Sequence, residues 1–293
     1  MNDRREACLY AAIEAPRDDH DRLLRQMIAP AIRELRGHPD LDSLFVVRYA
    51  DPVWQLRVRV LGRPAWIENE VRPWVERALQ PFRVAGTIGD VTFGEYVREW
   101  DRYGGPEGMR LAERVFFHDS LACLDRLDAE ARGDCARSRR EWSLTFTDDF
   151  LELVGLDDAA RVAFYRDAHQ WAFREGIFEE ADRAKLEARY QAVRDGLRAA
   201  RAARRGGDAR AAYGGAAPER IARTCLESLR PIVASIREGH ARGTIAEDPV
   251  RLAGSFTHLH CNRLGLDLPA EAILRYLMFR LYEDETAGVG PSI

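Results

Sequence analysis

The feature that most constrains this chain is a change of hydrophobic period at Gly104-Gly105-Pro106. Before this point, short apolar and alternating runs predict β-strands interspersed with helices. Nearly every later segment instead has the spacing of an amphipathic helix. The sequence therefore predicts an α+β fold. Its two subdomains are expected over residues 1–103 and 104–293, with the functional site at their junction.

The N-terminal part predicts the element order β-α-β-β-α-β. Asp51 and Pro52 provide a tight turn between the second and third strands, which makes that pair a hairpin. This order is that of a ferredoxin-like split unit, whose sheet has one face covered by helices and one face free for a ligand or another domain. The expected strands are residues 7–15, 43–50, 54–61 and 83–97, and the expected helices are residues 18–35 and 64–79.

The C-terminal part predicts a series of helices and no strand. Residues 198–217, rich in Ala, Arg and Gly, predict a helix end followed by a mobile loop. The tail from Glu285 to Ile293 is expected to be frayed. The expected helices are residues 106–132, 139–154, 157–174, 179–205, 218–240, 248–263 and 268–281.

Composition excludes several functional classes. The chain is 46% hydrophobic and 31% charged, which is typical of a soluble globular protein, and its net charge of −4 argues against nucleic-acid binding. The five cysteines form no CxxC pair, which favours reduced thiols in the cytoplasm. The sequence contains no GxGxxG, GxxxxGK[ST], HExxH or GxSxG motif and no apolar run of roughly 18 residues. We therefore expect no cofactor, no metal and no membrane span.

Two arginines in the predicted hairpin suggest an anion site. Arg57 and Arg59 lie two residues apart, so they share a strand face at a separation of roughly 7 Å. Adjacent guanidinium groups repel unless an anion lies between them, and Arg binds carboxylates and phosphates bidentately. The alternative is the solvated polar face of an antiparallel sheet, which the spacing alone favours.

A second polar group precedes the glycine pair. Glu99 and Arg102 are three residues apart and can pair with each other on a helical turn. The glycines after Tyr103 allow the backbone to turn sharply or to approach a ligand closely. On the sequence alone, a catalytic role and a structural ion pair before a helix are equally supported.

The stretch SFTHLHCNRLG contributes two histidines. His258 and His260 are two residues apart, so on a helix they face different sides, whereas a metal-binding pair needs a spacing of three or four. With no matched Cys or carboxylate spacing nearby, we do not predict zinc. One ring is expected to be packed and hydrogen-bonded, and the other is free to face a cleft.

Three stretches in this order carry a family resemblance. FVVRYADPVWQLRVRV, REWDRYGGPEGMRLAERVFFHDS and SFTHLHCNRLG together resemble the C-terminal elimination domain of class I lantibiotic dehydratases, also called the thiopeptide-type bacteriocin biosynthesis domain. The resemblance covers nearly the whole chain, and RYGG followed by AE and F-x-x-DS is a specific pattern. Leu259 stands where Met is common and Gln55 where His is common. Neither replaces a presumed catalytic group.

The resemblance implies a lyase reaction. A partner protein first esterifies a Ser or Thr of a precursor peptide with glutamate from glutamyl-tRNA. The elimination domain then removes the α-proton and expels glutamate, which leaves dehydroalanine or dehydrobutyrine. The catalytic residues carried over are Arg57, Arg59, Glu99, Arg102 and His258, and the substrate-binding residues are Arg48, Tyr103, Asn262 and Arg263.

The resemblance also defines the expected partners and the alternatives. The partners are a precursor peptide with its leader and a separate tRNA-dependent glutamylating protein. The chain is expected to be a free-standing copy, and a homodimer is common in the family. A second branch of the family makes pyridine rings by a formal [4+2] cycloaddition, and the retained Arg, Glu, Arg, His set favours elimination over that reaction. A non-catalytic alternative is a peptide-binding module that uses the free sheet face.

Overall fold

The structure is a computed structural model that describes residues 7–288, with side chains through Glu285. Contacts divide the chain into two compact units. Unit 1 comprises the residues up to Asp128 together with Ala234–Gly265, and unit 2 comprises Ala129–Val233 and the residues from Leu266 onward. These units divide the chain elsewhere than at residue 103, and the subdomains expected from the sequence stay a prediction.

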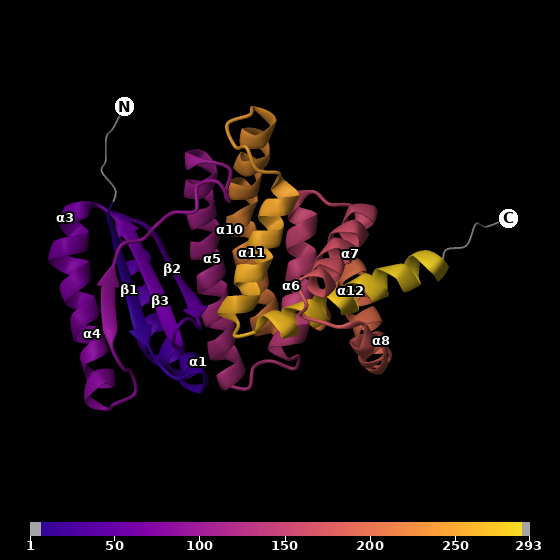
Figure 1. The fold of residues 1–293 in the computed structure, drawn as a ribbon, viewed down its shortest axis with the longest axis horizontal. Coiled ribbons are helices and arrows are strands. Elements are labelled where there is room, and N and C mark those ends of the chain that lie inside the picture. The colour runs from indigo at the N-terminus through magenta and orange to yellow at the C-terminus, as the bar shows by residue number, and fades with distance from the viewer. Residues whose placement is uncertain (1–6, 289–293) are drawn as a thin grey trace. The chain divides into compact units, whose positions relative to one another are not determined.

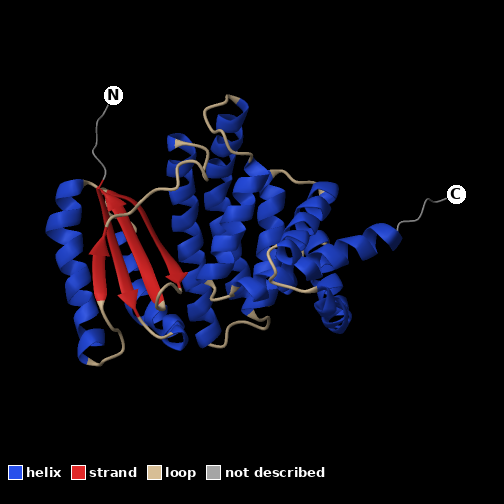
Figure 2. Cartoon of the chain, in the orientation of Figure 1, coloured by secondary structure: helices blue, strands red, loops and turns tan. Residues whose placement is uncertain are grey.

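Unit 1 contains the sheet. Its strands are β1 (Ala7–Glu14), β2 (Leu41–Tyr49), β3 (Gln55–Gly62) and β4 (Val91–Gly94). They lie in the order β2-β3-β1-β4, and every neighbouring pair is antiparallel (Figure 2). The predicted α+β class is therefore confirmed as a small antiparallel sheet near the N-terminus of a mainly helical chain.

Helices cover one face of this sheet. They are α1 (His20–Leu23), α2 (Ala29–Leu35), α3 (Pro64–Trp66) and α4 (Arg72–Val84) (Figure 1). The alternate residues Leu56, Val58 and Val60 of β3 are buried in their common core. Both predicted helices form, but each contains a π-helical turn just before a proline-bearing helix start. The π-helical turns are Leu24–Ile28 and Ile67–Val71. Pro30 and Pro73 lack the N–H that the α-helical ladder needs.

The fourth predicted strand, residues 83–97, is wrong at both ends. Helix α4 continues to Val84, and Gly86 follows it with a positive φ of 64°. Only Val91–Gly94 pairs with β1. Residues 95–99, which we call the strap, have no regular secondary structure, although their side chains alternate between exposed and half-buried as in an extended strand. The strap keeps the alternation of a strand but does not pair with β1, although β1 continues to Ala7 and pairs there with β3.

The glycine pair after the strap fits against a later loop. Gly104 has a φ of +75°, and its carbonyl accepts a hydrogen bond from Ala246 N–H at 3.1 Å. A Cβ at this position would lie only 2.7 Å from the backbone nitrogen of Glu247. Glycine is therefore required here both by the conformation and by the close approach. Helix α5 (Pro106–Ala131) begins directly after this turn.

Side chains from two helices cover the outer edge of β2. Ser120 of α5 accepts a hydrogen bond from Val46 N–H at 3.3 Å, and Arg263 of α11 (Pro249–Arg263) donates to Val46 C=O at 3.0 Å. The Asn262 amide accepts from Arg48 N–H and donates to Arg48 C=O, both at 2.9 Å. These side chains take the place of a fifth strand at this edge.

Unit 2 is helical. Its core contains Asp148, which is 3% exposed and accepts hydrogen bonds from Tyr282 and Arg201. Helix α10 begins in this unit and ends in unit 1. The helices are α6 (Arg139–Val154), α7 (Asp158–Arg174), α8 (Arg183–Arg205), α9 (Ala209–Tyr213), α10 (Ala216–Ala241) and α12 (Leu268–Gly288).

Two predictions for unit 2 are corrected. The mobile loop predicted within residues 198–217 contains α9, because Asp208 caps its first turn through Ala211 N–H and Tyr213 is buried at its end. The tail predicted to fray from Glu285 is helical to Gly288, while residues 289–293 lie outside the described residues. Within the described chain, none of the helices has the length and apolarity to cross a membrane.

Candidate functional site

The predicted anion site centres on Arg59, which has an aromatic environment. Its guanidinium lies 5.1 Å from the ring centre of Tyr10, 5.5 Å from that of Phe45 and 5.0 Å from that of Tyr96. Its Nε is buried and has no hydrogen-bond partner among the described residues. Burial lowers the pKa of Arg59 from its usual value, because desolvation disfavours the charged form. A partly desolvated guanidinium with an unpaired N–H favours binding of an anion.

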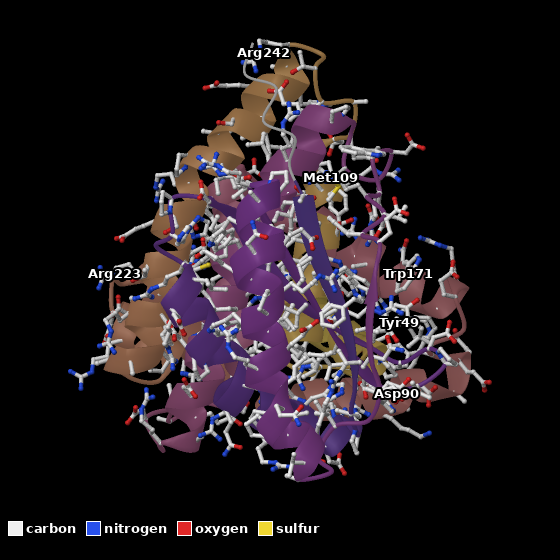
Figure 3. All side chains as sticks on the ribbon, turned by 90° about the vertical axis from the view of Figure 1, so that its left-hand side faces the viewer. Tyr49, Asp90, Met109, Trp171, Arg223 and Arg242 are labelled. Carbon is white, nitrogen blue, oxygen red and sulfur yellow. The ribbon has the colours of Figure 1, made fainter. Side chains whose placement is uncertain are left out.

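Arg57 lies on the same face of β3 and is also held by its neighbours. Its Nε donates to Gln55 at 3.1 Å, and its guanidinium lies 3.2 Å from the ring centre of Tyr49, which is labelled in Figure 3. The shared face predicted from the two-residue spacing is confirmed by the register of β3 with β1, in which Arg57 lies opposite Ala12 and Arg59 opposite Tyr10.

Glu99 and Arg102 form the predicted pair, and the pair contacts α11. Arg102 donates to Glu99 at 2.9 Å, with both side chains exposed to solvent. The Nε of Arg102 also donates to Ser255 at 3.3 Å. His258 lies one helical turn after Ser255, so the two share a face of α11, and His258 is half-buried. This hydrogen bond connects Arg102, which precedes the glycine pair, to the face of α11 that carries His258, the predicted base.

Tyr103 lies at the centre of these charges. Its ring is 2% exposed and packs against Phe116 and Phe256. Burial raises the pKa of Tyr103 to about 12, against the opposing effect of the Arg102 charge. Its hydroxyl also senses the charges of four predicted site residues: Arg102, Glu99, Arg263 and Arg59. Of these residues, Arg102 has its guanidinium 5.7 Å from the ring centre of Tyr103.

The strap is anchored by a carboxylate that sequence reasoning missed. Glu113 of α5 is 2% exposed and binds Arg98 through two contacts of 2.6 and 3.2 Å. It also bonds the hydroxyl of Tyr96, and burial together with this carboxylate raises the pKa of Tyr96 above its usual value. Because the ring of Tyr96 covers Arg59, Glu113 holds one wall of the anion site in place.

A hollow opens beside this wall. Its volume is about 440 Å³, and its lining residues include Cys8 at the start of β1 and Glu95, Tyr96 and Arg98 of the strap. Tyr96 lines this hollow, and its ring centre lies 5.0 Å from the guanidinium of Arg59. It forms where the strap separates from β1.

Two other predicted substrate-binding residues, Arg48 and Asn262, make hydrogen bonds within the protein. Arg48 is 8% exposed and bonds Asp21 at 2.6 Å and the carbonyl of Arg263 at 3.1 Å. Asn262 bonds both backbone groups of Arg48. These contacts account for the pattern of polar residues in the two motifs, and a substrate-binding role for Arg48, Asn262 and Arg263 stays a prediction.

His260 confirms the expectation that one of the two histidines is packed and hydrogen-bonded. Its Nδ1 lies 2.6 Å from Asp119, which is also bound by Arg263 at 2.7 Å. The pKa of Asp119 is lowered, since the charges of His260 and Arg263 outweigh its burial. Asp119, His260 and Cys123 offer three buried atoms within 4.8 Å of one another, a spacing that a metal could use. The Arg263 guanidinium on Asp119 opposes a further cation there.

Several residues of this site were not identified as functional from the sequence. Tyr96 and Arg98 could have been found from the two-residue alternation of the strap, which directs both to one side. Glu113 and Asp119 belong to the AE and F-x-x-DS patterns, but spacing alone does not say which groups they bind. Ser255 gave no signal.

Comparison with known families identifies one match over most of the chain. Residues 9–282 match the family model described as lantibiotic biosynthesis dehydratase C-term. The subtilin biosynthesis protein SpaB of Bacillus subtilis is 27% identical over 141 residues, which are 43% of this chain and 14% of that protein. The epidermin biosynthesis protein EpiB of Staphylococcus epidermidis is 22% identical over 142 residues, or 47% of this chain and 14% of that protein. The chain thus matches only a small part of these curated relatives.

Solved structures with the same fold include both long and short chains. The tRNA-dependent lantibiotic dehydratase MibB from Microbispora sp. 107891 aligns with a TM-score of 0.71 and 22% identity, covering 96% of this chain and 28% of MibB. TsrL aligns at 0.70 and 21%, covering 96% of both chains. The pyridine synthase TbtD from thiomuracin biosynthesis aligns at 0.66 and 17%, covering 97% of this chain and 99% of TbtD. At these identities the alignments show a shared fold.

Proposed function

Because the chain belongs to the lantibiotic biosynthesis dehydratase C-terminal family, we propose that it eliminates glutamate from glutamylated Ser or Thr residues of a precursor peptide. The products are dehydroalanine and dehydrobutyrine. The observation that carries this proposal is Arg59, a half-buried cation with aromatic walls, a buried Nε and no acidic partner among the described residues. Such a cation favours binding of an anion, and a glutamyl ester carries a free carboxylate.

The reaction has three requirements. A base removes the α-proton, the electron pair forms the Cα=Cβ bond, and the Cβ–O bond breaks so that glutamate leaves as a carboxylate. This leaving group needs charge neutralisation more than protonation. Elimination also places transient negative charge on the carbonyl next to Cα, which positive groups stabilise.

The residues of unit 1 can meet these requirements. His258 is the proposed base. Arg57 and Arg59 bind the glutamyl carboxylates, and Arg102 stabilises the carbonyl oxyanion or the departing carboxylate. Glu99 binds the glutamyl ammonium or holds Arg102, to which it is bonded at 2.9 Å. Tyr103, whose ring centre lies 5.7 Å from the Arg102 guanidinium, is the proposed donor to a substrate oxygen.

The remaining expectations complete the proposal. Glutamylation requires a separate tRNA-dependent protein, and the substrate carries a leader peptide. We also propose that the region from β1 to β4 is a ferredoxin-like split unit. The strand order β2-β3-β1-β4, with helices between β1 and β2 and between β3 and β4, supports this.

Incubation with a chemically glutamylated serine peptide tests the function. The readouts are released glutamate and the mass of the peptide. We expect the wild-type protein to form dehydroalanine and Arg59→Gln to lower kcat/KM by about 100-fold, as expected for a lost charge-stabilising group. The matched control is Arg63→Gln, an exposed arginine just after β3 that pairs with Asp40. Equal activity of Arg59→Gln and Arg63→Gln would contradict the assignment.

A pyridine synthase activity is the second candidate. It is supported by the alignment to TbtD, which covers nearly the full length of both chains. A peptide that already contains two dehydroalanines separates the two activities. Ring formation from this peptide, without glutamate release from the glutamylated one, would favour cycloaddition.

A further inference from the structure

The two edges of the sheet differ in whether side chains bond their outward backbone groups. At the β2 edge, Ser120, Asn262 and Arg263 bond the backbone groups of Val46 and Arg48. A peptide strand cannot be added there without displacing these buried contacts. The opposite edge is formed by β4, which pairs only with β1 in the described part of the chain.

The β4 edge presents backbone groups in a regular alternation. Glu14 of β1 donates its N–H to Asp90 C=O at 2.9 Å and accepts from Gly89 N–H at 2.8 Å. In an antiparallel ladder, alternate residues face the partner, so Thr92 and Gly94 also turn toward β1. Val91 and Phe93 therefore direct their backbone groups outward.

The strap prolongs this edge. Among the described residues, the backbone groups of Glu95, Tyr96 and Val97 have no hydrogen-bond partner. Val97 is 76% exposed. The strap is nevertheless held from the other side, because Tyr96 and Arg98 both bind Glu113. Glu95, Tyr96 and Val97 thus form an anchored, strand-like segment whose backbone groups have no partner among the described residues, and such a segment can accept another strand with little loss of conformational entropy.

We propose that β4 and the strap bind the substrate peptide as an added β-strand. This inference rests on the proposed function and identifies how the peptide backbone is bound. The occupant is a linear, extended peptide that carries an O-glutamyl residue. The charge arrangement favours this occupant, because Arg59 lies directly under the strap residue Tyr96 and the Glu99–Arg102 pair lies at the end of the strap. A glutamyl carboxylate on the added strand would complete the vacant pairing of Arg59.

An added strand would allow one site to bind modified residues in different sequence contexts. Backbone hydrogen bonds do not depend on the side chains of the peptide, whereas the arginines recognise the glutamyl group. Substrate specificity then comes from recognition of the glutamyl group. The strap sets the register in which the peptide backbone pairs. Peptides that cannot be extended, such as those with proline next to the modified residue, are expected to be poor substrates.

Hydrogen exchange on the full-length protein tests the binding mode directly. The probe is a linear peptide with one O-glutamyl serine at its centre. To prevent turnover, it is added to a His258→Gln variant. We expect slower exchange of amides in residues 91–99 and no added protection in β2. Protection confined to other segments at saturating peptide would overturn the proposal.

A substrate-side experiment avoids any effect on folding. Peptides are N-methylated at one backbone position at a time, and KM is measured with the wild-type protein. An added strand predicts a pattern of period two, in which alternate methyl groups raise KM by about 3- to 10-fold, the size of one lost hydrogen bond. A uniform effect at all positions, or none, would overturn the proposal.

A pair of variants examines the strap itself. Val97→Pro removes an N–H and Val97→Ser keeps it. Both change the same exposed side chain. We expect Val97→Pro to raise KM more than Val97→Ser, and more for the long peptide than for N-acetyl-O-glutamyl-serine methylamide. Val84→Ser, at another exposed valine, is the control. Equal effects of Val97→Pro on the two substrates would count against the proposal.

The two proposals can fail separately. If no glutamylated substrate is converted but residues 91–99 become protected, the elimination function fails and peptide binding stands. If glutamate is eliminated but neither protection nor the period-two pattern appears, the function stands and the added strand is excluded.

Discussion

Arg59 is half-buried and His20 is buried, and each has one buried side-chain nitrogen without a partner among the described residues: Nε of Arg59 and Nδ1 of His20. Arg59 has its aromatic walls, while His20 donates from Nε2 to Ala15 C=O at 3.2 Å. The sequence located Arg59 by its two-residue spacing to Arg57. It gave no sign of His20, because burial of a single histidine depends on tertiary packing rather than on local pattern.

His20 gives a pH prediction. Burial lowers its pKa from 6.5 to about 4, with the Arg48 charge acting in the same direction. As pH falls from 6.5 to 4, the unfolded chain takes up a proton that the folded protein resists, so stability decreases in this window. We expect a loss on the order of 2 kcal/mol. His20→Gln should remove this slope in urea unfolding measured across the window.

A second titratable group, Glu187, affects stability at the lower end of the pH range of this experiment. Hydrogen bonds from Arg280 depress the pKa of Glu187 to about 2, so its contribution is lost only as pH falls from 4.5 toward 2. The two windows overlap little. A slope between pH 5 and 6.5 that persists in His20→Gln would mean that another group is responsible.

At the scale of elements, the hydrophobic period of the sequence predicted most helices and strands, and tertiary packing shortened the fourth strand. The hairpin and the helices were predicted from alternation and from 3.6-residue spacing, and their bounds agree closely with the structure. The predicted strand over residues 83–97 failed because a strand needs a partner as well as a pattern, and β1 supplies one only for Val91–Gly94. The interactions of Asn262 and Glu113 could not be predicted, since they join segments far apart in sequence.

The hydrogen bonds of Asn262 to the edge of β2 are expected to stabilise the fold. Asn262→Ala removes both bonds to the Arg48 backbone and leaves its N–H and C=O unpaired at the β2 edge. We expect a loss of about 1–3 kcal/mol in the free energy of unfolding, measured in urea. The control is Asn69→Ala, an exposed asparagine. If both variants lose the same stability, the edge bonds contribute nothing measurable.

At the scale of the whole molecule, the chain is divided into two units with different interiors. Unit 1 has an apolar core between sheet and helices, whereas unit 2 contains the buried carboxylate of Asp148. Arg161 and Arg201 each contact this carboxylate and are themselves less than 10% exposed. Both of these arginines are thus committed to internal ion pairs.

Asp148→Asn tests this organisation. It removes the charge that two buried guanidinium groups share, which we expect to destabilise unit 2 by about 3–5 kcal/mol. Hydrogen exchange should show faster opening of α6, α8 and α12 than of β1–β3. Asp195→Asn, at an 87% exposed side chain, is the control. Uniform acceleration across both units would show that they open together.

The covering of the β2 edge has a consequence for biosynthesis. Asn262 and Arg263 bond residues 214 to 217 positions earlier in the chain. The ribosome therefore releases β2 long before the side chains that cover its edge exist. During that interval the nascent chain exposes a hydrogen-bonding edge to its neighbours on the polysome. Expression at lower temperature, or with a chaperone that binds unpaired strands, should raise the yield of folded protein more than that of a truncated form lacking β2.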